Sequence, residues 1–424
     1  MSEIQCSTRV LLWAALALGL PAGGLAQEPA SPTASVGGSL SAAFHAAWSQ
    51  QPEQRAAAER DRANRAAERA AERWTAEPPA LEAQHTRGRS AAQAQEWELG
   101  VVVPLWLPRE RERTARKAQA AARWTLTQRK RAEWELAGRV REAWWAVQRS
   151  QADLALQRDR LDAAARLAAD MERRARAGDL AQSDVHQAWM AKAQAQAAVK
   201  QAEAELSAVH TSWAELVPAL SPPAGTEDGV LVTEPVPQPM DTEPDAGYRH
   251  PMRAEALERA EAARKALELA QVQSRANPEL SLGAVREREG PGEPGRTSWR
   301  AALRWPLGQG AAHEARVATA SAEWIEAQAA AELVLRRTAA DAAQAKARLD
   351  AARAQLATAE QRAHWAQELR GFVDKAYRFG EADAPSRLRV EQEAVEARRA
   401  LMRARLDVGA AISQWRQSLG LLMD

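Results

Sequence analysis

The sequence has very few cysteines, tyrosines and phenylalanines. It contains one cysteine, two tyrosines and three phenylalanines among 424 residues. The one cysteine, Cys6, lies in the N-terminal segment that is predicted below to be removed as a signal peptide. The rest of the chain would then have no disulfide, no thiol nucleophile and no cysteine-bound metal. The seven histidines show no metal-ligand spacing, and we find no serine–histidine–aspartate arrangement, phosphate loop or nucleotide fingerprint. The sequence therefore predicts no enzyme, no cofactor and no metal site.

The chain also lacks an excess of charge of either sign. Its 57 basic and 56 acidic residues give a formal net charge of +1. Basic and acidic residues alternate along the same stretches, which is typical of solvated helix faces with pairs one turn apart. Nucleic acid is therefore not an expected partner.

Long hydrophobic runs are missing, and the one short run lies near the N-terminus. Arg9 precedes the apolar segment Val10–Leu20, which is followed by Pro21 and a small-residue site ending at Ala26. The run is too short to span a bilayer, so residues 1–26 are predicted to be a signal peptide. An exported chain without cysteine points to the periplasm or the outer membrane.

Alanine, arginine, glutamate and leucine are the most prominent residues of the sequence. This composition favours long helices packed through small side chains.

The chain also contains an internal repeat. Four anchor residues recur 202 positions later, and two prolines recur 199 positions later. The pairs are Trp97/Trp299, Pro104/Pro306, Gly178/Gly380, Trp213/Trp415, Pro52/Pro251 and Pro79/Pro278. We interpret the chain as a tandem duplication.

The predicted domains are a first repeat over 27–217, a proline-rich linker over 218–250 and a second repeat over 251–424. Each repeat reads as helix, strand, strand, very long helix, break and returning helix. The predicted elements of the first repeat are a helix over 40–76, strands near 81–85 and 97–105 within a hairpin over 80–106, and helices over 109–176 and 180–217. Those of the second are a helix over 251–276, strands near 279–287 and 297–307 within a hairpin over 279–307, and helices over 310–378 and 381–422.

The long helix of the first repeat has no proline and a single glycine, Gly138. At about 1.5 Å per residue it would reach roughly 100 Å, which is too long for the interior of a compact domain. Apolar or small residues recur along it at alternating spacings of four and three, as in a coiled coil. They are Val140, Trp144, Val147, Leu154, Leu161, Ala165 and Ala168, and Gln151 and Arg158 interrupt the series.

The predicted strands alternate between apolar and polar residues. Such alternation over about ten residues with terminal aromatics is typical of a transmembrane barrel; the alternative is a small soluble sheet with one buried face. The residues predicted to face lipid are Trp97, Leu99, Val101, Trp299, Leu303 and Trp305. Those predicted to face a pore are Glu98, Arg300 and Arg304. Four strands cannot close, and open edges in lipid are prohibitive, so three chains forming a 12-stranded barrel are expected.

These features together resemble the TolC-like outer-membrane efflux family. The resemblance rests on the duplicated helix–hairpin–helix plan and on the strand-to-helix segment Val101–Arg111, with its counterpart Ala302–Gly310. The helix-break segments Arg174–Ala188 and Ala376–Ala394, and the strand start Ala276–Gly283, also fit. The resemblance covers about Leu40 to Leu422.

The resemblance implies a mainly α fold with a small β part. Three chains would form a β-barrel in outer-membrane lipid and a helical tunnel across the periplasm. The tunnel tip would dock on a periplasmic adaptor coupled to an inner-membrane pump. The implied function is a passive exit duct for efflux, of heavy-metal cations or drugs. A soluble periplasmic coiled-coil scaffold or adaptor is the alternative.

The two helix breaks are expected to form the tip that opens and meets the adaptor. In relatives, acidic residues six and nine positions after the second break glycine narrow the mouth. Here those positions hold Ser386 and Arg389, so that constriction is absent or moved. The predicted tip residues are Gly178, Asp179, Asp184, Gly380, Glu381, Asp383, Ser386 and Arg389.

Overall fold

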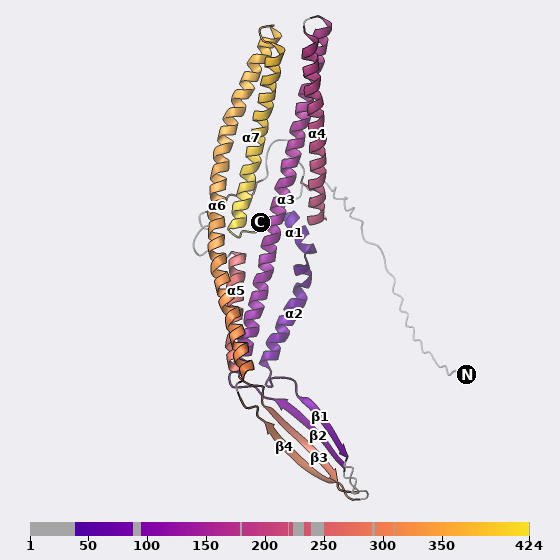
Figure 1. Ribbon diagram of the computed structural model, residues 1–424, viewed down its shortest axis with the longest axis vertical. Coiled ribbons are helices and arrows are strands. Elements are labelled where there is room, and N and C mark those ends of the chain that lie inside the picture. Colours follow the sequence, from indigo (N-terminus) through magenta and orange to yellow (C-terminus); the bar gives the residue numbers. More distant parts are fainter. Residues whose placement is uncertain are drawn as a thin grey trace, which may run out of the picture. The chain divides into compact units, whose positions relative to one another are not determined.

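Two very long helices dominate the computed structural model (Figure 1). α3 spans Glu110–Arg176 and α6 spans Ala311–Arg378, 67 and 68 residues respectively, so each is roughly 100 Å long. α3 packs against the returning helix α4, Gln182–Leu216, and α6 against α7, Ala384–Ser418. The predicted pair of long helical hairpins is therefore observed.

The structure describes residues 39–87, 95–178, 180–218, 220–223, 233–238, 250–290, 293–308 and 310–423. The predicted signal peptide and Asp179 lie outside the described residues, as does most of the proline-rich linker. All described residues belong to one structural unit, Gly37–Asp424. None of its described helices combines the length and the apolar composition needed to cross a membrane.

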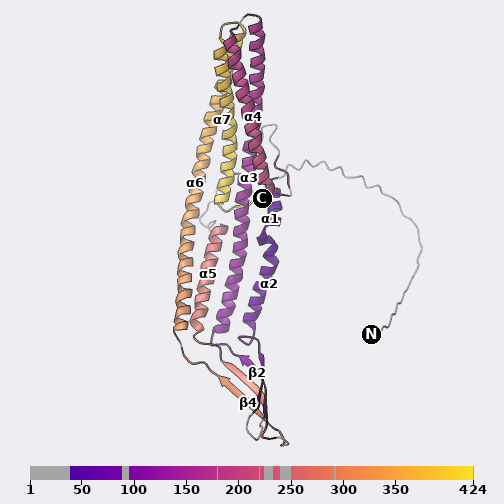
Figure 2. The same ribbon diagram turned by 45° about the vertical axis from the view of Figure 1, so that its right-hand side comes forward.

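Shorter helices cover the half of α3 and α6 that is nearer the sheet (Figure 2). α5, Pro251–Val272, packs against both α3 and α6. The predicted single helix over 40–76 is instead two helices, α1 Leu40–Gln50 and α2 Pro52–Glu72. The break has a local cause, because Pro52 cannot donate to the preceding turn and disfavours helical backbone at Gln51, which is extended.

The four strands form one antiparallel sheet in the order β1-β2-β3-β4. They are β1 Ala80–Arg87, β2 Gln95–Pro104, β3 Glu279–Arg288 and β4 Arg296–Arg304. The pairing of β2 with β3 joins the two halves of the sequence. β4 ends before Trp305, earlier than expected, since the next residue, Pro306, has no N–H for the ladder and restricts Trp305.

A buried carboxylate fixes the junction between the sheet and α3. Glu110 is 2% exposed, and its carboxylate accepts from the Leu107 backbone N–H at 2.9 Å. It also accepts from Gln273 Nε2 and Asn277 Nδ2, each at 2.8 Å. One side chain at the start of α3 thereby holds the chain segment that leads from α5 into β3.

The helical core follows the predicted seam of α3. Val140, Trp144 and Val147 are buried in the largest apolar cluster, with Trp213 of α4. Trp145, next to the seam, reaches the second repeat: its Nε1 donates to Ser413 Oγ at 2.9 Å. A Cβ added to Gly409 would lie 2.3 Å from the Trp145 ring, so this glycine lets α7 approach α3 closely.

Candidate functional site

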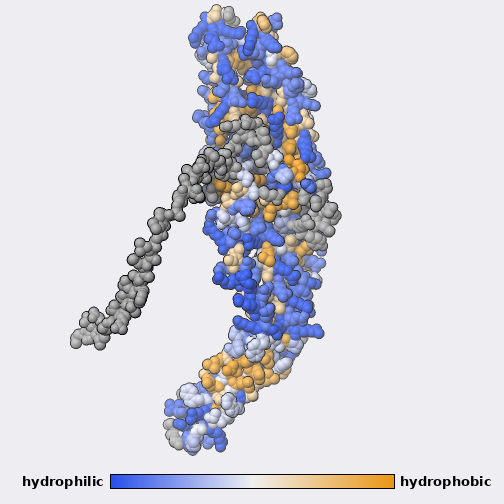
Figure 3. Space-filling model, turned by 180° about the vertical axis from the view of Figure 1, so that it is seen from behind, coloured by the Kyte–Doolittle hydropathy of each residue, from blue (hydrophilic) through white to orange (hydrophobic). Residues whose placement is uncertain are grey.

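The strand register sorts the sheet residues onto two faces with opposite chemistry. Directly paired residues in a ladder share a face, and the pairs Leu99↔Ala284, Val101↔Leu282 and Leu280↔Leu303 are all apolar. The apolar face comprises Leu81, Ala83, Trp97, Leu99, Val101, Val103, Leu280, Leu282, Ala284, Trp299, Ala301 and Leu303. It is visible as a hydrophobic band across the sheet in Figure 3.

The apolar face is the exposed one. Trp299 is 87% exposed, and Leu99 and Leu303 are 57% and 58% exposed. Along β2 the polar-face residues are half-buried, whereas Trp97, Leu99 and Val101 are exposed. A sheet that is stable in water buries its apolar face, whereas here β2 exposes its apolar side and β1 and β4 are exposed on both sides within the described chain.

Ion pairs cover the polar face. Arg300 on β4 reaches Glu98 on β2 at 2.6 Å and Glu96 at 3.5 Å. Arg304 lies 3.5 Å from Glu279 on β3. The lack of side chains at Gly100 and Gly283, which oppose each other between β2 and β3, leaves room above the ladder for the long Arg300 side chain.

The register therefore gives each predicted barrel residue a definite position. Trp97, Leu99, Val101, Trp299 and Leu303 share the apolar face, whereas Glu98, Arg300 and Arg304 share the polar face. Trp305 lies just beyond β4 and is 49% exposed. Which face meets lipid and which meets a pore stays a prediction.

Both edges of the sheet are open in the described chain. β1 pairs only with β2, and β4 pairs only with β3. Each edge therefore presents unpaired backbone N–H and C=O groups that another strand could satisfy.

At the opposite end of the long helices, both hairpins turn at glycines (Figure 1). Gly178 and Gly380 have φ values of +87° and +78°, a left-handed conformation that glycine adopts without penalty. The Gly380 N–H donates to the Tyr377 carbonyl, and the Glu381 N–H to the Ala376 carbonyl. A Cβ at either glycine would meet open space.

The side chains nearest the turns form a network that the sequence analysis missed. Arg387 of α7 lies 2.9 Å from Asp374 of α6 and 3.6 Å from Asp170 of α3. The guanidiniums of Arg174 and Arg387 lie 4.3 and 4.6 Å from the centroid of the buried Tyr377 ring. This tip network connects both helical hairpins within one chain.

One feature of the sequence indicates charge pairing near the tip: oppositely charged residues stand four apart at the ends of both long helices. Asp374 and Arg378 pair one turn apart in α6, and Glu172 and Arg176 pair in the same way in α3. The two pairs occupy equivalent places in the repeat. Arg387 has no such counterpart. The sequence places it among the charged residues near the second break, but only the packing of α7 on α3 and α6 shows its partners.

The predicted tip residues differ in their roles. Asp383 caps α7, because its carboxylate accepts from the Ser386 N–H at 3.0 Å. A hydrogen bond with the Ser386 side chain, together with that backbone bond and the nearby charge of Arg389, lowers the pKa of Asp383 below its usual value. Asp184 lies in the first turn of α4. Within the described chain, neither Asp184 nor Arg389 forms an ion pair.

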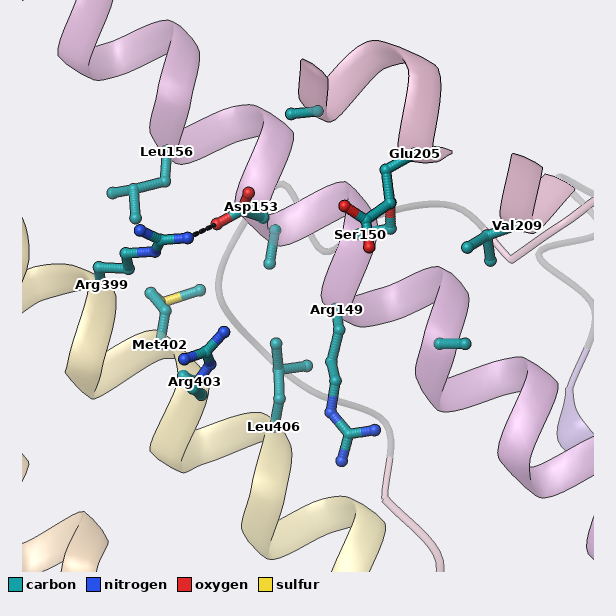
Figure 4. A pocket seen from close by; sticks show the side chains of 13 residues that line it. Arg149, Ser150, Asp153, Leu156, Glu205, Val209, Arg399, Met402, Arg403 and Leu406 are labelled. Carbon is teal, nitrogen blue, oxygen red and sulfur yellow. Dashed lines mark hydrogen bonds and ion pairs between the residues drawn. The ribbon is translucent and has the colours of Figure 1, made fainter. Parts of the chain in front are cut away.

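A charged groove of about 380 Å³ runs between α3, α4 and α7 (Figure 4). Arg399 of α7 donates to the Asp153 carboxylate of α3 at 2.9 Å. Met402 and Leu406 line the same groove from α7. The groove is thus a mixed polar and apolar seam where the second hairpin meets the first.

Part of the predicted linker packs against both repeats. Glu234 lies 2.7 Å from Arg141 of α3 and 3.2 Å from Arg416 of α7. Both arginine side chains are less than a tenth exposed. Burial of such charges requires full pairing, so this segment is a clamp between the repeats rather than a simple connector.

No protein-family model and no curated protein matches the sequence. Solved structures match it over most of its length. The outer membrane protein VceC from Vibrio cholerae has a TM-score of 0.73 at 18% identity and covers 91% of this chain and 97% of its own. CusC, whose structures concern folding and transmembrane channel formation, has a TM-score of 0.75 at 14% identity. The match covers 90% of this chain and 92% of CusC.

A membrane protein from Pseudomonas aeruginosa has a TM-score of 0.74 at 17% identity and covers 90% of each chain. The chain therefore has the fold of TolC-like outer-membrane channels, as the sequence resemblance implied. At these identities the likeness establishes the fold, and the function is argued separately.

Proposed function

We propose that the chain is one subunit of a homotrimeric outer-membrane channel. The channel would be the passive exit duct of a tripartite efflux system, with the sheet in the outer membrane and the helices in the periplasm. The observation that carries this proposal is the inverted sheet, whose apolar face is exposed and whose polar face is ion-paired. Lipid outside and water inside is the arrangement that fits those faces.

The open sheet edges support the trimer. In lipid, unpaired backbone groups each cost several kcal/mol, so β1 of one chain would pair with β4 of the next. Eight strands from two chains would enclose a lumen filled by side chains, whereas twelve strands from three chains leave room for a conduit.

The helix turns are proposed to form the periplasmic tip that opens and contacts an adaptor protein coupled to an inner-membrane pump. The tip network around Arg387 would hold the two hairpins of a chain together in the closed state. Gly178 and Gly380 would present the turn to the adaptor, because no other described side chain covers them.

The polar face favours cations as cargo. Its paired positions hold the glutamates Glu82, Glu96, Glu98, Glu279 and Glu287 and the arginines Arg296, Arg300 and Arg304. Glutamates therefore outnumber arginines on the surface proposed to line the lumen. Heavy-metal cations or cationic drugs would meet a favourable field there.

Cell fractionation tests the proposal against the alternative of a soluble periplasmic scaffold. The chain is expected in outer-membrane fractions, and the purified protein is expected to form ion-conducting pores in planar bilayers. Recovery in the soluble periplasm without detergent, with no conductance, would instead favour the scaffold. If the chain forms a channel, deletion of the sheet should abolish conductance. If it is a soluble scaffold, the same deletion should leave its solubility unchanged.

A further inference from the structure

The apolar face of the sheet ends in a row of basic side chains near the hairpin ends. Arg87 of β1 and Arg288 of β3 are both paired in register with Gln95 of β2, while Arg286 is paired with Trp97. His85 is also paired with Trp97, and the two rings stack with centroids 4.1 Å apart. We call His85, Arg87, Arg286 and Arg288 the basic border.

The arginines of the basic border differ from Arg300 and Arg304 on the other face because they form no ion pair within the described chain. Arg300 and Arg304 are each paired with glutamates. Arg87, Arg286 and Arg288 are exposed, and no ion pair or hydrogen bond joins them to another described residue. The acidic residues at the same height, Glu96 and Glu287, lie on the polar face.

The position of the basic border next to the apolar face indicates which groups could neutralise the positive charge of its arginines. Trp97 and Trp299 lie at the hairpin end of the band, where aromatic side chains favour the boundary between hydrocarbon and headgroups. His85 and Arg286 are level with Trp97, and Arg87 and Arg288 lie two residues further out along their strands, at about 3.3 Å per residue. Arginines there would reach the headgroup region, where phosphate oxygens can accept bidentate hydrogen bonds.

We infer that the basic border binds the phosphate groups of anionic lipids in the leaflet that meets the hairpin ends. This inference rests on the proposed insertion of the sheet into a membrane. In a trimer the border would recur three times around the barrel. The two faces differ in charge pairing: Arg87, Arg286 and Arg288 outside have no ion pair within the described chain, whereas Arg300 and Arg304 inside are ion-paired.

The test is the lipid preference of the full-length assembly in vesicles, measured with spin-labelled lipids. The fraction of motionally restricted label gives the association constant of phosphatidic acid relative to phosphatidylcholine. We expect wild type to prefer phosphatidic acid at least about fivefold, which is the contribution of one well-placed arginine. The preference should weaken as salt rises. The triple variant R87Q/R286Q/R288Q should lose most of it.

Two further variants make the result specific. R87K/R286K/R288K keeps the charge and should keep most of the preference. R336Q/R353Q/R362Q removes three exposed arginines from α6 and should leave the preference at its wild-type value. A wild-type ratio near one, or an unchanged ratio in R87Q/R286Q/R288Q, overturns the inference while leaving the channel intact. Failure of wild type to insert into vesicles of either lipid counts against the proposed function itself.

Discussion

At the scale of single residues, Arg387 has the most connected position at the helix tip. Its guanidinium lies between Asp374 and Asp170 and over the Tyr377 ring. The charged partners are about a quarter exposed, so each contact contributes only about 0.5–1 kcal/mol. Several together can still shift a closed-to-open ratio roughly tenfold.

If the chain forms the proposed trimeric channel, Arg387→Ala is expected to raise its resting conductance severalfold without changing trimer yield. Single-channel recording in planar bilayers measures the effect. Arg353→Ala, an exposed α6 arginine with no ion pair within the described chain, is the matched control. An unchanged open probability in Arg387→Ala would show that the tip network does not hold the mouth closed.

His250 gives the helical part a dependence on pH. The side chain is 4% exposed and its Nδ1 accepts from the Met252 N–H at 3.2 Å, capping α5. Burial, aided by the charge of Arg253, lowers the pKa of His250 to about 4. Because the unfolded chain binds the proton near pH 6.5, the stabilisation is complete above that pH and is lost as the pH falls towards 4.

The assembly should therefore lose up to about 1 kcal/mol per pH unit between pH 6.5 and 4. Urea unfolding of the wild type at pH 7 and pH 5 measures the loss. His250→Asn keeps a capping oxygen but does not titrate in this range, so its pH dependence should be flatter. Equal slopes for the two proteins would mean that His250 is not the responsible group.

At the scale of elements, β4 offers the sharpest test of the sheet faces. Leu303 and Arg300 lie three residues apart on opposite faces. Leu303→Arg should cost about 2–4 kcal/mol if that face meets the middle of a bilayer, and trimers should no longer assemble. Arg300→Ser removes the partner of Glu98, so assembly should survive and cation selectivity should rise.

Trimer yield from outer membranes and reversal potentials in a salt gradient measure the two effects. Labelling of cysteine variants with a membrane-impermeant reagent checks the register independently: Arg300→Cys should react from the lumen and Leu303→Cys should not. The reverse labelling pattern would show that the faces are assigned the wrong way round.

The elements themselves were largely predictable from the sequence. The spacing of Val140, Trp144 and Val147 predicts the buried seam of α3, and all three are buried. Other large apolar side chains on the long helices are not covered: Trp189 and Trp365 are 45% and 63% exposed. The periodicity of a helix shows which residues share a stripe, but not which stripe a second chain would cover.

At the scale of the whole molecule, the proposed trimer should resist dissociation at room temperature and fall apart on heating. Twelve strands in a closed ladder satisfy every edge group, and the interlocked backbone separates only when the ladder melts. Unheated samples in sodium dodecyl sulfate should migrate as trimers and boiled samples as monomers. Only monomers by mass measurement in mild detergent would contradict the closed ladder.

The sequence by itself determined the order of elements along the chain. Two strands and a long helix occur twice, and each long helix ends at a glycine, Gly178 or Gly380. These follow from local rules, since periodicity, proline and glycine act over a few neighbouring residues. The tertiary structure alone decided that the apolar face is the exposed one, that Glu110 pins the sheet to α3, and that Arg387 and Glu234 each bridge the two repeats. Such contacts join residues from about 90 to more than 200 positions apart, and no local pattern specifies which distant side chains will meet.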